Sequence, residues 1–241
     1  MTRLLATMKT DVTVQFRNRL YTIGIFVGAI IAVALSQLAH PDRLFIIVPV
    51  LMLIVVGGTT MLYVAAMIIF ERDEGTLNAL IVSPLRTSEY LWSKIITLTA
   101  LATLESIVMI GGAMLIMKWS HPVAWPNIPL LLVGVIGIGV IYTLIGIILI
   151  VRYEKITDFL LPMATIAVVL QLPFLHFLGL VVHPLFLVIP TSAPTMLMQG
   201  AYIPLTPGQW IYATAYTTAL ILLLAAWAFR AFDKHIVAKA G

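Results

Sequence analysis

The sequence predicts an all-α integral membrane protein with six transmembrane helices. Of its 241 residues, 61% are hydrophobic and 10% are charged, whereas about a quarter of the residues of a soluble domain are charged. Crossing roughly 30 Å of hydrocarbon takes about 20 apolar residues in a helix, so the chain has room for about six crossings with short loops. The long apolar runs lack the alternation of barrel strands, which favours helices.

The N-terminal segment 2–20 has the pattern of an amphipathic helix. Leu4, Met8 and Val12 recur every four residues, and Arg17 lies on the other face. Such a helix lies along the membrane surface with its apolar face in the acyl region and its basic residues toward the headgroups. The sequence therefore predicts an interfacial helix before the first crossing.

The six crossings are expected at 21–39, 44–70, 95–117, 128–151, from 159 onward, and 210–229. The first contains Gly24 and Gly28, a small-xxx-small pair that allows close contact with another helix. The fifth is expected to be broken by Pro162 and Pro173, because proline cannot continue a helix without losing a backbone hydrogen bond. Further prolines follow in the apolar segment 181–207, which predicts short helical pieces that re-enter the outer leaflet.

The distribution of basic residues predicts the topology. All but two of the 14 Lys and Arg residues lie in the N-terminal segment, in 71–94, in 152–158 or in the C-terminal tail, and the exceptions are Arg43 and Lys118. Because cytoplasmic segments carry the excess of positive charge, both termini are expected in the cytoplasm, in a multi-pass protein of the inner (cytoplasmic) membrane. The basic excess sets topology here and gives no indication of nucleic-acid binding.

Segment 71–94 holds the densest run of charge in the chain. Between its charged ends, residues 75–83 form a short amphipathic stretch that stops at Pro84, and Leu77, Leu80 and Ile81 have the i, i+3, i+4 spacing of one helix face. Composition alone leaves two interpretations open, a solvated loop and a segment that another protein binds.

The same segment resembles a known family. Its residues fit the pattern E-x-x-x-G-T-L-x-x-L-x-x-[ST]-P-L-x-x-x-E-Y-x-x-x-K of the ABC-2 family of ABC-transporter permeases, at Glu71, Gly75, Thr76, Leu77, Leu80, Ser83, Pro84, Leu85, Glu89, Tyr90 and Lys94. The resemblance implies that 1–241 is a single transmembrane permease domain in which 71–94 is a cytoplasmic coupling loop, with its helix in a cleft of an ATP-binding subunit. It implies an ATPase-coupling role for Glu71, Gly75, Thr76, Leu77, Leu80, Ile81, Ser83 and Pro84.

The ATPase itself is expected in another chain. The sequence has no G-x-x-x-x-G-K-[ST] motif, so this chain is not expected to be an enzyme or to bind a cofactor, and ATP and Mg would bind the partner ATPase subunit. The resemblance also implies a second permease chain, identical or not. It further implies export of a small hydrophobic or amphipathic compound, such as a drug or a lipid, out of the bilayer or the cytoplasm.

Three polar residues are expected inside the membrane and are candidates for the substrate path, namely Glu105, Gln171 and His176. Glu105 lies well inside the third crossing, where an ionisable group is costly. A structural acid that is hydrogen-bonded to another helix is the alternative reading, and we favour it from the sequence because no intramembrane cation is evident. The histidines are dispersed, so no metal site is expected.

Two functions of other classes remain open. A secondary transporter could be driven by protons through Glu105, and it would need no ATPase. A membrane assembly or anchoring protein could use 71–94 only to recruit a partner.

Overall fold

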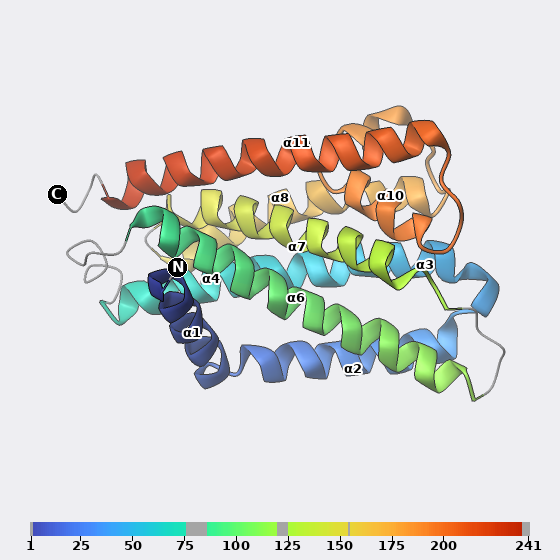
Figure 1. The fold of residues 1–241 in the computed structure, drawn as a ribbon, viewed down its shortest axis with the longest axis horizontal. Coiled ribbons are helices and arrows are strands. Elements are labelled where there is room, and N and C mark those ends of the chain that lie inside the picture. The colour runs from blue at the N-terminus through green and yellow to red at the C-terminus, as the bar shows by residue number, and fades with distance from the viewer. Residues whose placement is uncertain (1, 76–85, 120–124, 154, 238–241) are drawn as a thin grey trace.

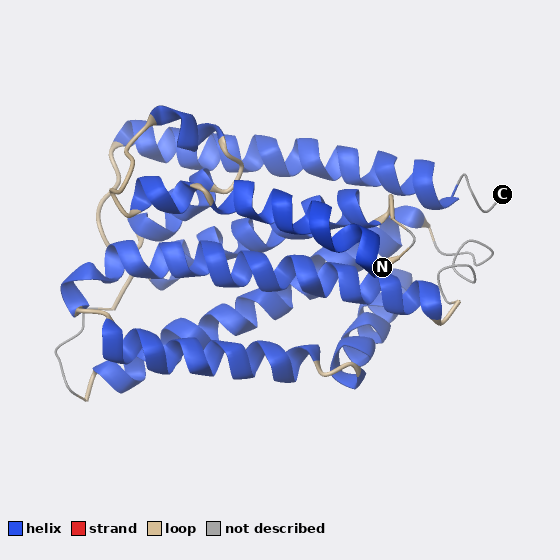
Figure 2. Cartoon of the chain, turned by 180° about the vertical axis from the view of Figure 1, so that it is seen from behind, coloured by secondary structure: helices blue, strands red, loops and turns tan. Residues whose placement is uncertain are grey.

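The structure is a computed structural model that describes residues 2–75, 86–119, 125–153 and 155–237. All regular secondary structure in these residues is helical (Figure 2). Six of the helical segments are long and apolar enough to cross a membrane: Leu20–Leu38, Pro41–Arg72, Thr87–Met117, Ile128–Ile150, Thr157–Phe177 and Pro207–Ile236. The predicted all-helical, multi-pass membrane fold is therefore confirmed.

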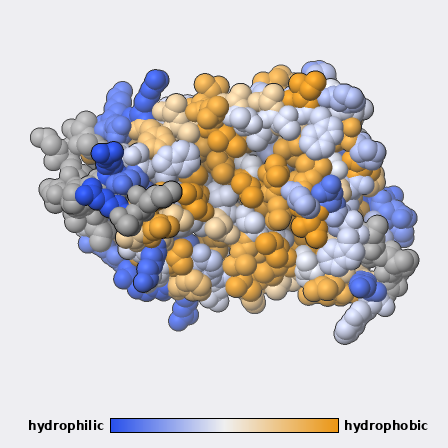
Figure 3. All heavy atoms as spheres, viewed as in Figure 1, coloured by the Kyte–Doolittle hydropathy of each residue, from blue (hydrophilic) through white to orange (hydrophobic). Residues whose placement is uncertain are grey.

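The first and the last described residues lie at the same end of the elongated bundle (Figure 1). We call this the inner end and the opposite one the outer end, after the predicted topology. Hydrophilic side chains gather at the two ends, and a mostly hydrophobic band lies between them (Figure 3). This banding is the surface expected of a protein whose middle lies in hydrocarbon.

Helix α1 (Thr2–Arg17) lies at the inner end and runs steeply across the direction of the long helices (Figure 1). The turn into α2 (Leu20–Leu38) is made at Arg19, whose φ of 59° lies in the left-handed region. The exposed side chains of Leu5 and Phe16 fit the predicted apolar surface of α1, and its position at the lipid interface stays a prediction.

The second crossing consists of three consecutive pieces. Helix α3 (Leu44–Leu51) continues through a π-helical turn at Met52–Val56 into α4 (Gly57–Asp73). A π-helical turn disturbs the regular backbone pairing, and such turns are frequent at functional sites. Here the Thr60 hydroxyl donates a 2.6 Å hydrogen bond to the carbonyl of Val56.

The third and fourth crossings are α6 (Thr87–Met117) and α7 (Ile128–Ile150). Because α4 reaches Asp73 and α6 begins at Thr87, helical structure extends into both ends of the segment predicted as a loop at 71–94. In α7, 78% of the most apolar 18-residue stretch is buried by the rest of the chain, against 17% of the corresponding stretch in the fifth crossing. Helix α7 is thus the centre of the bundle.

The fifth crossing, α8 (Ile156–Gln171), runs through Pro162 without interruption, so the break predicted there is wrong. The carbonyl that loses its partner is that of Asp158, in the exposed first turn, where the loss is least costly. The helix does end before Pro173, which begins the short helix α9 (Pro173–Phe177).

The chain then folds back at the outer end before α11 (Pro207–Phe232). A short 3₁₀ helix (Pro184–Val188) leads to α10 (Ser192–Gly200), which packs against α3, α7 and α11. Contact with α7 is close at Gly134, where a Cβ atom would lie 2.4 Å from Cγ of Met198. Short helices are thus present within 181–207, and their position in the outer leaflet stays a prediction.

Candidate functional site

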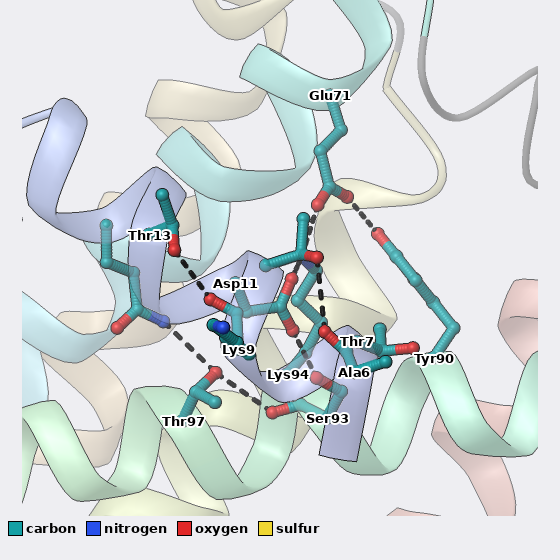
Figure 4. Close-up of polar contacts among 12 residues, drawn as sticks. Ala6, Thr7, Lys9, Asp11, Thr13, Glu71, Tyr90, Ser93, Lys94 and Thr97 are labelled. Atoms are coloured by element: carbon teal, nitrogen blue, oxygen red, sulfur yellow. Dashed lines mark hydrogen bonds and ion pairs between the residues drawn. The ribbon is translucent and has the colours of Figure 1, made fainter. Parts of the chain in front are cut away.

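A buried charge cluster joins three helices at the inner end (Figure 4). Its centre is Lys94 of α6, whose side chain has no exposed surface. The Lys94 ammonium donates to Oδ1 of Asp11 in α1 at 2.5 Å and also to Oε1 of Glu71 in α4. One cation therefore holds two carboxylates that are far apart in the sequence.

Hydroxyl groups complete the charge cluster. Ser93 donates to Oδ2 of Asp11, and the Tyr90 hydroxyl donates to Oε2 of Glu71 at 2.5 Å. Each of the four carboxylate oxygens thus accepts a hydrogen bond, as buried charges require. The Lys94 ammonium also lies 5.0 Å from the centre of the Tyr90 ring, within the range of a cation–π contact.

A second contact extends the junction of α1 and α6. The Gln15 amide donates to the Thr97 hydroxyl at 3.1 Å, and Thr97 donates to the carbonyl of Ser93. Two helix faces therefore meet here. The face of α1 carries residues 11 and 15, and the face of α6 carries residues 90, 93, 94 and 97. The face that α1 turns to the bundle thus carries the buried polar residues Asp11 and Gln15 beside the partly buried Val14.

The charge cluster lies where the predicted coupling segment joins α4 on one side and α6 on the other. Glu71 is in the last turns of α4, and Tyr90 and Lys94 are in the first turns of α6. Arg17 of α1 adds an exposed ion pair to Glu74, with a distance of 2.5 Å between Nη2 and Oε1. The chain is thus held to α1 where α4 ends and where α6 begins.

Most residues predicted to couple to an ATPase lie outside the described residues, namely Thr76, Leu77, Leu80, Ile81, Ser83 and Pro84. Glu71 and Gly75 are described. The carboxylate of Glu71 points to Lys94 and Tyr90, toward the inside of the bundle. Gly75 has a φ of 70°, a left-handed conformation that favours glycine, and it ends the turn after α4.

Glu105, farther along α6, is a different kind of site. It is 1% exposed, and its Oε2 atom accepts hydrogen bonds from Thr59 at 3.0 Å and from Tyr63 at 3.3 Å, both in α4. Its Oε1 atom is buried and has no hydrogen-bond partner among the described residues. Glu105 forms no ion pair with any other described residue.

Helix α2 covers Glu105 through its glycines. A Cβ atom on Gly24 would lie 3.6 Å from Oε2 of Glu105, and one on Gly28 would lie 3.0 Å from the backbone oxygen of Glu105. The small-xxx-small pair therefore makes the predicted close helix contact, and it does so within the chain, against α6.

The contacts of the other two path candidates are with residues other than Glu105. The Gln171 amide at the end of α8 donates to the carbonyl of Ile54, in the π-helical turn, at 3.3 Å. His176 in α9 packs edge-on against Phe177, with ring centres 5.6 Å apart, and its Nδ1 atom is buried without a partner among the described residues. In that same set of residues, no group of three or more His, Asp and Glu side chains could hold a metal ion.

Sequence reasoning missed the α1 side of the charge cluster, Asp11 and Gln15, together with Ser93 and Thr97. A signal was available for Asp11, the one acidic residue in a basic amphipathic segment. Tyr90 and Lys94 carry a second signal, because their i, i+4 spacing places them on one face of a helix.

Six apolar crossings with a buried charge cluster next to a cross-lying N-terminal helix define a multi-pass membrane protein. More narrowly, this chain belongs to the fluoroquinolones export permease protein family, since a model of that family matches residues 2–240. The match confirms the resemblance to exporter permeases of the ABC-2 type.

Two relatives carry the same description. They are the fluoroquinolones export permease proteins of Mycobacterium tuberculosis strains CDC 1551 / Oshkosh and ATCC 25618 / H37Rv. Each is 28% identical to this chain over 251 residues, a match that covers 100% of this chain and 99% of the relative.

Proposed function

We propose that this chain is the permease of an ATP-driven exporter and that it works with a separate ATP-binding subunit and a second permease chain. Its cargo would be small amphipathic compounds with planar ring systems, in the manner that the relatives' description as fluoroquinolone exporters suggests. Both termini and segment 71–94 would face the cytoplasm, and the outer end would face away from it.

The main support for this proposal is the position of the charge cluster, which lies at both junctions between the coupling segment and the helices α4 and α6. A segment that transmits movement must be joined rigidly to the helices that it moves. Lys94 ties the end of α4 to the start of α6 and ties both to α1. Force on residues 76–85 would therefore act on three helices together. Glu71 would take part in coupling from inside the bundle, through Lys94.

The direct test uses the predicted partner-binding face of the coupling segment. The permease is expressed with its proposed ATP-binding subunit, with either Leu80→Asp or Ile81→Asp. A charge on the apolar face is expected to lower copurification of the ATPase at least tenfold and to abolish transport. Asn78→Asp, which adds the same charge off that face, is the matched control and is expected to change neither.

The rival functions give different results in this experiment. A proton-driven transporter would keep full transport in the Leu80→Asp and Ile81→Asp variants, because it needs no ATPase. An anchoring protein would recruit a partner through the segment, and no cargo would move in the unsubstituted protein. If recruitment and transport both survive the two substitutions, the coupling role of 75–83 is wrong.

A further inference from the structure

A second feature of the molecule combines an apolar groove with the unpaired carboxylate of Glu105. The groove lies between α2 and α3, has a volume of about 240 Å³, and is lined by apolar side chains: Ile31, Ala34, Leu35, Leu38, Ala39, Ile47 and Leu51. Its lining offers almost no polar group. It is therefore suited to a hydrophobic ring system or chain.

Glu105 of α6 lies farther inward, beside α2 and beside α4, which continues from α3 through the π-helical turn. On α2, Gly24 touches Glu105 and lies two turns, or roughly 10 Å, from Ile31 of the groove, on the same helix face. On the other wall, Thr59 lies roughly 12 Å along the helix from Leu51. Thr59 is partly exposed and donates to Glu105. The groove and the carboxylate thus follow one seam.

The hydrogen bonding of Glu105 is incomplete in a way that indicates a cationic partner. Both hydroxyl donors, from Thr59 and Tyr63, reach Oε2, while Oε1 is buried without a donor among the described residues. The buried carboxylate of Asp11, by contrast, has both oxygens bonded and has Lys94 beside it. A protonated amine would supply what Glu105 lacks, a positive charge together with N–H donors.

We infer that Glu105 binds the protonated amine of an amphipathic cargo whose apolar rings lie in the groove between α2 and α3. This inference rests on the proposed export function and specifies the cargo, which is an amine-bearing, ring-containing compound. In the present structure Gly24 and Tyr63 close the site. Access requires rotation of the Thr59 and Tyr63 side chains or separation of α2 from α6.

The test compares two quinolones that differ in the amine. Norfloxacin carries a basic piperazine ring, whereas flumequine is a fluorinated quinolone acid without a basic amine. ATP-dependent uptake of both is measured in inside-out vesicles that contain the permease and its ATPase. Glu105→Gln keeps the size of the side chain and an oxygen acceptor for Thr59 and Tyr63, and it removes the charge. It is expected to lower the norfloxacin-to-flumequine uptake ratio at least tenfold.

Two further variants serve as controls for this ratio. Thr103→Val removes a hydroxyl from α6 that is bonded to the carbonyl of Thr99, away from Glu105, and should leave the ratio unchanged. Ala34→Phe fills the groove and should lower uptake of both quinolones by a similar factor. An unchanged ratio in Glu105→Gln, with uptake of both quinolones retained, overturns the inference and leaves the export function standing. Absence of uptake of either quinolone by the unsubstituted exporter refutes the proposed function instead.

A measurement on the unsubstituted protein keeps the inference testable if Glu105→Gln does not fold. The O–H of a protonated carboxyl group adds across a C=N bond of a hydrophobic carbodiimide, and the resulting O-acylisourea rearranges to a stable N-acylurea, which mass spectrometry of the Glu105 peptide detects. Norfloxacin is expected to lower labelling of Glu105 at least fivefold, and flumequine less than twofold. Equal protection by the two quinolones, or by neither, contradicts recognition of the amine.

Discussion

Two buried acidic sites on α6 differ in how their charge is balanced. At Lys94 two carboxylates share one ammonium, and each of their oxygens accepts a hydrogen bond. At Glu105, eleven residues or roughly 16 Å farther along the helix, one oxygen has two donors and the other has none among the described residues. Glutamate thus occurs at two kinds of site: Glu71 has both oxygens bonded and a cation beside it, whereas Glu105 has one oxygen without a donor among the described residues.

The difference indicates two roles. A fully bonded ion cluster rigidifies the helices that it joins, and its removal leaves an uncompensated charge. An acid with an unused acceptor contributes less to stability and keeps the capacity to bind a partner. We therefore expect the charge cluster to carry movement between helices and Glu105 to meet the cargo. The following substitutions test that contrast, from the largest effect to the smallest.

Lys94→Met should have the largest effect, because it removes the buried cation that the carboxylates of Asp11 and Glu71 share. Breaking a buried pair in this way typically costs about 3–5 kcal/mol. Yield and thermal stability in detergent should fall sharply. The triple variant Asp11→Asn, Glu71→Gln, Lys94→Met, which removes all three charges, should recover part of the loss. Unchanged stability of Lys94→Met would show that the charge cluster does not hold the three helices together.

Gly28→Ala should come next, since its new Cβ atom would lie 3.0 Å from the backbone oxygen of Glu105 and the backbone cannot yield easily. Forcing an extra carbon into a close contact costs about 1–3 kcal/mol. Gly24→Ala should cost less, because its nearest atom is the Tyr63 hydroxyl at 3.1 Å, which can rotate away. Gly111→Ala is the control, with no atom within 4 Å. Thermal unfolding that ranks the three in another order would contradict the observed packing of α2 on α6.

Asp11→Asn should be tolerated better than Lys94→Met, because it leaves Glu71 and Lys94 as a balanced pair. Asparagine keeps an oxygen acceptor for Lys94, and its amide can donate to the Ser93 hydroxyl. A loss of about 1 kcal/mol is expected in denaturant or thermal unfolding. Asp11→Ala, which removes both contacts, should cost more. Equal losses for the two variants would mean that the side chain of Asp11 acts only through its charge.

Gln171→Leu should have the smallest effect, since it removes one hydrogen bond of 3.3 Å to Ile54 and keeps the size of the side chain. A stability loss of about 0.5 kcal/mol, the low end for a neutral hydrogen bond, is expected. The ratio of uptake of norfloxacin to that of flumequine should not change, because Gln171 bonds Ile54 and not Glu105 or its donors Thr59 and Tyr63. A changed ratio would place Gln171 on the cargo path together with Glu105.

Much of the fold could be predicted from the sequence because lipid imposes simple rules. Apolar runs of fixed length predict the crossings, and each predicted crossing corresponds to a helix. The break at Pro162 was mispredicted because a helix tolerates proline where the freed carbonyl lies in an exposed first turn. The start of α6 was placed too late, at 95 instead of Thr87, because polar residues such as Ser93 and Lys94 were assigned to the loop, although their partners lie inside the bundle.

The candidate sites were less predictable. Glu71 and Lys94 could be found by their motif, but their third partner, Asp11, is about eighty residues from Lys94 in sequence, and only packing brings it there. Glu105 could be selected as a buried acid from its position in an apolar run. Its hydrogen bonds to Thr59 and Tyr63, and its unpartnered oxygen, depend on the packing of α4 and α2 against α6, which periodicity does not fix.

The contrast between the two acidic sites leads to one question, which is where energy enters the transporter. If the proposed function is right, ATP acts through the coupling segment and the charge cluster; if a proton gradient drives transport, it acts through Glu105. The decisive measurement is uptake of flumequine into inside-out vesicles that contain both subunits, with a protonophore present. We predict uptake that requires ATP and is unaffected by the protonophore. Uptake that follows an imposed proton gradient without ATP would contradict this account.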